Sequence, residues 1–82
     1  MGILEKVIEI ISAVMGIPKE QITKDSKLLE DLKMDELDGT EAVMAIEEKF
    51  NITIPDEEIE KFTTIEDIVN CVSANIKKES GN

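Results

Sequence analysis

Residues with strong side-chain chemistry are scarce in this chain. Its 82 residues include no His, Trp or Tyr, only two Phe and a single Cys. One cysteine excludes an internal disulfide, which fits a reducing compartment. The many carboxylates are expected on polar helix faces, whereas general acid–base catalysis would need them in a cleft with separated pKa values. We therefore predict that the protein is not an enzyme and has no catalytic residues.

Long apolar runs are also missing. No segment approaches the ~20 residues that span a bilayer, and the first residues lack the basic and apolar regions of a signal peptide. We expect a cytoplasmic protein that does not bind a membrane.

Positive charge is in short supply as well. The chain has nine Lys and no Arg against 19 acidic residues, which gives a net charge of −10. Residues 35–60 hold ten of the acids and only one Lys. This field would repel nucleic acids and anionic lipids and would steer the protein toward a basic partner surface. The alternative is a solvated face that only keeps the protein soluble.

Hydrophobic periodicity predicts one all-α domain over residues 1–82, a small bundle of three longer helices and one short helix. The first helix starts near Ile3, and Gly16 stops it, with Pro18 preventing its resumption. Thr64 is the expected N-cap of the last helix. Residues 1–2 and 78–82 are expected to fray. The other helices are predicted at residues 36–50, 55–62 and 64–78.

The connection between the first two helices, residues 16–35, is long and charged. A structureless loop of this length is unusual in a compact domain, so we expect its apolar side chains to pin it to the core. These side chains are Ile17, Ile22, Leu28, Leu29 and Leu32.

The second helix has a clear start signal. Asp35 can accept a hydrogen bond from a free backbone N–H of the first turn, and Asp38 lies where the helix dipole favours an acid. The stripe expected to face the core consists of Leu37, Val43, Ile46 and Phe50, with Ala42 beside it.

Two stretches, "EDLKMDELDGTEAVMAIEEKFNITIPDEE" and "KFTTIEDIV", resemble the acyl carrier protein family, and the resemblance extends over nearly the whole chain. The family has the four-helix fold predicted above. Its members carry acyl chains as thioesters on a phosphopantetheine arm. They present an acidic second helix to basic patches on synthases, transferases and reductases.

The chain departs from the family at the position of attachment. The family attaches its arm to a Ser between Asp and Leu, and the corresponding residue here is Glu36. A carboxylate cannot attack coenzyme A to form the phosphodiester. Ser26 has a neighbouring Asp but lies in the connecting loop, so we expect no cofactor. Glu at a helix N-terminus is stabilising in any case, although its charge could instead imitate the phosphodiester.

We therefore predict an acyl-carrier-protein-like docking or regulatory module, without an arm, for enzymes of fatty-acid or polyketide-type metabolism. The alternative is a genuine acyl carrier protein of fatty acid biosynthesis that carries phosphopantetheine, with Glu36 an engineered or divergent replacement. We expect a monomer, although the wide apolar face of the first helix could also contact a second copy. The resemblance implies a partner-docking surface formed by Asp35, Leu37, Asp38, Glu41, Met44, Glu47, Glu48, Ile54 and Asp56.

Two further groups of residues are given simple interpretations. The acidic clusters lack the spacing of an EF-hand, so we predict no specific metal site. Cys71 has no His or second Cys near it in the sequence, and we expect it to be a small, partly buried side chain beside the core.

Overall fold

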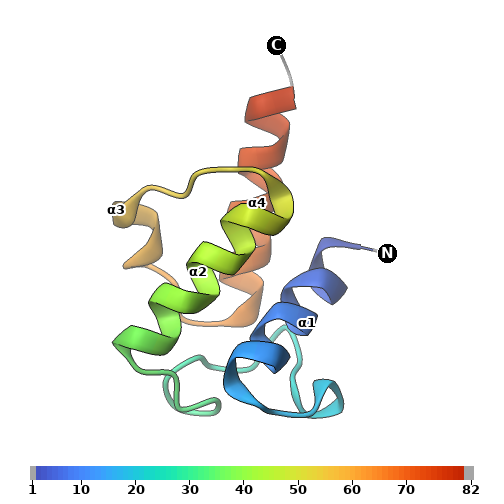
Figure 1. The fold of residues 1–82 in the computed structure, drawn as a ribbon, viewed down its shortest axis with the longest axis vertical. Coiled ribbons are helices and arrows are strands. Elements are labelled where there is room, and N and C mark those ends of the chain that lie inside the picture. The colour runs from blue at the N-terminus through green and yellow to red at the C-terminus, as the bar shows by residue number, and fades with distance from the viewer. Residues whose placement is uncertain (1, 81–82) are drawn as a thin grey trace.

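The computed structural model describes residues 2–80, with side chains described as far as Ile76, and it is all-helical as predicted (Figure 1). None of the helices in this part of the chain is long and apolar enough to cross a bilayer. Residue 1 and residues 81–82, parts of the ends predicted to fray, lie outside the described residues. The elements are α1 (Ile3–Met15), the 3₁₀ helix η1 (Lys19–Gln21), α2 (Glu36–Phe50), α3 (Asp56–Ile59) and α4 (Ile65–Ser80).

The helix ends follow the capping signals in the sequence. Gly16 ends α1 in the left-handed conformation, at φ 70°, and its N–H donates to the Ser12 carbonyl at 2.8 Å. The Thr64 hydroxyl accepts the N–H of Asp67 at 3.3 Å, which confirms Thr64 as the N-cap of α4.

The third helix is shorter than predicted. It ends at Ile59 instead of Phe62, and Pro55 is its N-cap and not a helical residue. Beyond the helix the backbone tightens, because the N–H groups of Lys61 and Phe62 each bond a carbonyl three residues back. The 3₁₀ helix η1 was not predicted.

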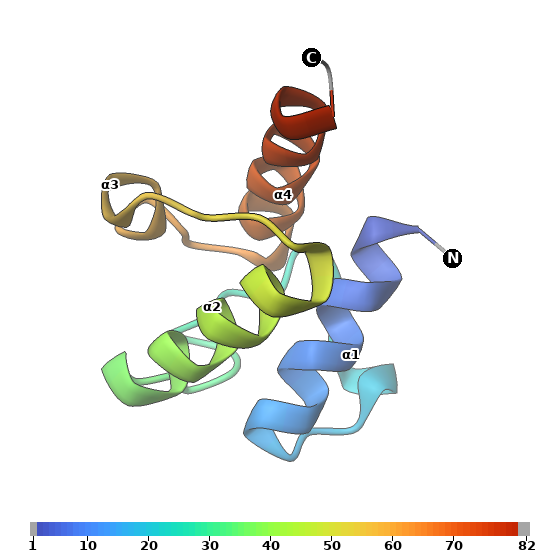
Figure 2. The same ribbon diagram turned by 45° about the horizontal axis from the view of Figure 1, so that its top comes forward.

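The core forms where α1 packs against both α2 and α4 (Figures 1 and 2). Its centre is aliphatic, and each such side chain contributes about 1.5–3 kcal/mol when fully buried. The least exposed large side chains are Val7, Ile11, Ile46, Ile65 and Val72.

The loop before α2 is fixed to the start of α4 by three backbone hydrogen bonds. The N–H groups of Ile65 and Glu66 donate to the carbonyls of Ser26 and Lys24, at 3.1 and 2.9 Å. In the opposite direction, the Leu28 N–H donates to the Thr63 carbonyl at 2.9 Å. Ile22 and Leu32 are buried beneath the loop, as predicted. Leu29 is 71% exposed, so the prediction that it packs inward is wrong. Its neighbour Leu28 turns toward the core, which leaves Leu29 on the outside.

Candidate functional site

The start of α2 is built by two carboxylates that cap each other's backbone. Asp35 accepts the N–H of Asp38 at 2.9 Å, and Asp38 accepts the N–H of Asp35 at 3.2 Å. This reciprocal arrangement satisfies donors that the first turn of a helix leaves free. The predicted N-cap role of Asp35 is confirmed, and Asp38, which was predicted only to be favoured by the helix dipole, also accepts a backbone hydrogen bond.

Glu36 is the first residue of α2 and is exposed. Its backbone carbonyl accepts the Thr40 hydroxyl at 3.0 Å, which is a bond within the helix. Its side chain lies at the rim of both large pockets described below. A negative charge therefore stands at the helix N-terminus, where the dipole favours it.

Four side chains form one outward face of α2, which we call the outer stripe: Leu37, Glu41, Met44 and Glu48. Their spacings of four, three and four residues place them on the same side of an α-helix. Leu37 is 76% exposed and Met44 63% exposed. The stripe thus alternates apolar side chains with carboxylates.

One of the sequence predictions for α2 is corrected by these exposures. Leu37 does not belong to the stripe that faces the core, because it lies about half a turn around the helix from the buried Ile46. The prediction that Ala42 and Ile46 face inward is confirmed, and Val43 and Phe50 pack against the core from partly buried positions. Leu37 keeps its place among the predicted docking residues, since it is on the surface.

The remaining docking candidates divide into structural and exposed residues. Ile54 is only 4% exposed, so its side chain lies beneath the surface, and its role in docking stays a prediction. Its N–H donates to the half-buried Glu47 carboxylate at 2.8 Å, which fastens the loop before α3 to α2. Asp56 is exposed at the first turn of α3. Glu47 and Ile54 thus also support the local structure, in addition to any contact that they make with a partner.

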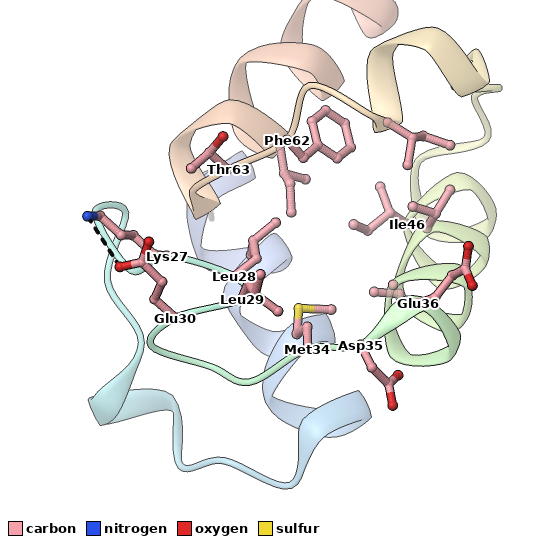
Figure 3. A pocket seen from close by; sticks show the side chains of 15 residues that line it. Lys27, Leu28, Leu29, Glu30, Met34, Asp35, Glu36, Ile46, Phe62 and Thr63 are labelled. Atoms are coloured by element: carbon pink, nitrogen blue, oxygen red, sulfur yellow. Dashed lines mark ion pairs between the residues drawn. The ribbon is translucent and has the colours of Figure 1, made fainter.

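A pocket of about 440 Å³ opens between the loop before α2, α2 itself and the segment after α3 (Figure 3). Side chains converge on it from these elements, whereas the Asp35 side chain points away from it. Lys27 and Glu30 form an ion pair at one edge, with N and O 3.6 Å apart. The interior lining is apolar and includes Leu28, Met34, Ala42, Val43, Ile46, Ile59, Phe62 and Ile68.

Met34 and Phe62 were not recognised from the sequence as pocket residues. Met34 is 8% exposed, and its N–H donates to the Leu28 carbonyl at 3.0 Å, which folds the loop back under itself. The sequence signal available for Met34 was its position as an apolar residue directly before the N-cap of α2. The turn that carries Met34 under the loop is closed by backbone bonds between residues four to six apart, and these bonds follow no periodic pattern that the sequence could indicate.

A second pocket of about 500 Å³ lies between α2 and α3. Its apolar lining comes from Val43, Met44, Ile54 and Ile59. Acidic side chains from both helices surround that lining, so the opening is negatively charged. They are Glu36, Glu47, Asp56 and Glu60.

Ser26 and the acidic clusters carry no further site chemistry. Ser26 is 8% exposed, and its hydroxyl accepts the N–H of Thr23 at 2.9 Å. Among the side chains that the structure describes, which extend as far as Ile76, Asp, Glu and Cys form no group of three or more that could hold a metal ion.

Comparisons with known proteins give one consistent result. The family described as "Phosphopantetheine attachment site" matches residues 5–72. The acyl carrier protein of Wolinella succinogenes is 44% identical over 75 residues, which cover 92% of this chain and 99% of that protein. The acyl carrier protein of Guillardia theta is 46% identical over 74 residues, covering 90% of this chain and 91% of that protein.

Proposed function

The chain belongs to the acyl carrier protein family, and we propose that it serves acyl-chain metabolism by docking to basic surfaces of enzymes such as synthases, transferases and reductases. The observation that carries this proposal is the outer stripe of α2. Leu37 and Met44 are exposed there between the carboxylates of Glu41 and Glu48.

The outer stripe has the chemistry of a contact surface. Large apolar side chains gain free energy when a partner removes them from water, and Met is common at protein interfaces. The surrounding carboxylates accelerate the approach of a basic surface and select against acidic ones. A purely solubilising face would not need two exposed apolar side chains at the centre of the acidic segment.

We infer that the chain, as written, docks without a phosphopantetheine arm. The arm requires a hydroxyl that can form a phosphodiester, and Glu36 offers a carboxylate. The Ser26 hydroxyl is buried and already bonded to Thr23. The residues present therefore do not fit the attached group.

The second candidate function is that of a genuine carrier of acyl thioesters. The names of both relatives and the family description favour this function. The apolar pocket of about 440 Å³ beside Glu36 also suits a hydrocarbon chain. The carrier function applies to a form of the protein with Ser at position 36, or to this chain if Ser26 is modified.

Intact mass separates these two functions. The protein is incubated with a phosphopantetheinyl transferase and coenzyme A, beside the variants Glu36→Ser and Ser26→Ala. We expect no mass increment on the unaltered chain or on Ser26→Ala, and the increment of the arm on Glu36→Ser. An increment on the unaltered chain that disappears in Ser26→Ala would establish the carrier function and contradict the armless one.

Binding to a synthase or transferase of acyl metabolism tests the docking surface. We expect Glu41→Lys and Glu48→Lys each to weaken binding by about 5- to 50-fold at low salt, with helical content unchanged. Glu20→Lys is the matched control, because Glu20 is an exposed acid on η1, outside the outer stripe. Equal affinities for all four proteins would show that the stripe is only a solubilising face.

A further inference from the structure

The short helix α3 depends on its neighbours for its position. It has four residues and no fully buried side chain, and a helix of this length is not stable by itself. Figure 2 shows α3 set apart from α1. The connection before α3 is fixed to α2 by the hydrogen bond between Ile54 and Glu47. The connection after α3 is fixed to the loop before α2, because the Leu28 N–H donates to the Thr63 carbonyl.

One side-chain hydrogen bond joins α3 itself to another helix among the described residues. The Cys71 thiol on α4 donates to the Glu58 carboxylate at 2.8 Å. The side chain of Asn75, 9% exposed, donates to the Cys71 carbonyl at 2.8 Å and lies 3.4 Å from the sulfur. These contacts hold the thiol in place opposite Glu58.

The thiol keeps its proton under ordinary conditions. Burial, reinforced by the hydrogen bond to Glu58 and its negative charge, raises the pKa of Cys71 to about 12. A protonated thiol can donate to a carboxylate, whereas a thiolate would be repelled by it. The thiol is therefore available as a hydrogen-bond donor throughout the physiological pH range.

The position of α3 also determines the shape of both large pockets. Ile59, on α3, lines each of them, and Phe62 lines the pocket of about 440 Å³. A movement of α3 away from α4 would carry these two side chains outward and widen the pockets.

We propose that the hydrogen bond between Cys71 and Glu58 is a latch that holds α3 against α4 and limits the entry of apolar molecules into the pocket of about 440 Å³. Breaking the latch lets α3 move while α1, α2 and α4 stay packed, because the core side chains Val7, Ile11, Ile46 and Val72 belong to those three helices. This inference goes beyond the proposed function and does not depend on it.

Hydrogen exchange tests the latch by a double-mutant cycle of Cys71→Val, Glu58→Ala and the combined variant. We expect each single change to speed exchange of the Glu60 and Phe62 amides about three- to tenfold, and the combined variant to add little. The amide of Ile46 in α2 should be unaffected. Additive effects, or an equal acceleration in α1 and α2, would overturn the proposal.

Glu57→Ala is the matched control for Glu58→Ala. Glu57 has the same charge and lies in the same turn of α3, but it is exposed, and the Cys71 thiol donates to Glu58 instead. It should leave exchange in α3 within about twofold of the unaltered protein. If Glu57→Ala acts as strongly as Glu58→Ala, the effect belongs to the helix dipole and the latch is refuted.

Uptake of the neutral dye N-phenyl-1-naphthylamine tests the gating part of the proposal. A neutral probe avoids repulsion by the acidic rim. The association rate of the dye should rise about three- to tenfold in Cys71→Val and in Glu58→Ala, as expected for amide exchange. It should stay unchanged in Glu57→Ala. An unchanged rate in both latch variants would overturn the proposal, because α3 would then not control entry.

Discussion

Asp35 and Asp38 accept hydrogen bonds from each other's backbone N–H groups at the first turn of α2, with N–O distances of 2.9 Å and 3.2 Å. Both carboxylates therefore serve the helix. Glu36 and Leu37, which lie between them in the sequence, are left to project into solvent. The tip of α2 consequently exposes a carboxylate and a large apolar side chain side by side.

Removing the cap should destabilise the whole domain. We expect Asp35→Ala to lower the free energy of unfolding by about 1 kcal/mol, which corresponds to a fall in Tm of roughly 4–8 °C for a domain of this size. Asp35→Asn retains an oxygen acceptor and should lose less. Thermal unfolding followed by circular dichroism measures both, and equal losses would contradict the capping role.

The outer stripe and the core should respond differently to truncation. Leu37→Ala should change stability by less than about 0.5 kcal/mol, because the side chain is on the surface. It should nevertheless weaken binding to a synthase or transferase. Ile46→Ala should cost about 2–5 kcal/mol, because Ile46 is fully buried. Urea unfolding and titration calorimetry distinguish the two, and a large stability loss in Leu37→Ala would argue against an exposed contact residue.

Lys33 has a backbone conformation that is unfavourable for any residue with a Cβ atom. Its φ is 59°, in the left-handed region, where a Cβ costs about 1–2 kcal/mol. Glycine removes that cost but loses more entropy on folding, so Lys33→Gly should raise stability by about 0.5–1 kcal/mol. Lys33→Ala keeps the Cβ and is the control. A gain in Lys33→Ala equal to that in Lys33→Gly would assign the effect to the side chain and not to the backbone.

Asp67 should make stability depend on pH in the acid range. Backbone N–H groups of Thr63 and Thr64 donate to its carboxylate at 2.9 and 3.0 Å, and these bonds lower the pKa of Asp67 below its ordinary value of 3.8. A lowered pKa contributes stability that is complete above pH 3.8 and is lost as pH falls through the folded-state value. We expect Asp67→Asn to be less stable at pH 7, with the difference shrinking below about pH 4. A constant difference between pH 7 and pH 2 would contradict this assignment.

Local signals in the sequence were sufficient for the helices and their ends. The Asp35 cap, the Gly16 stop and the Thr64 cap were all predicted, because each involves bonds within four residues of the chain. The core positions Ala42 and Ile46 followed from helical spacing. The family also followed from the sequence, since its motif lies in consecutive residues.

The pockets, the burial of Ile54 and the contact between Cys71 and Glu58 were decided by the tertiary structure. Periodicity gives the angle between two side chains on one helix, but it does not say which of two apolar faces a neighbouring helix will cover. For this reason Leu37 was assigned to the core and is exposed. Cys71 and Glu58 are 13 residues apart in the chain and meet only because the chain turns between α3 and α4, and no local pattern encodes that approach.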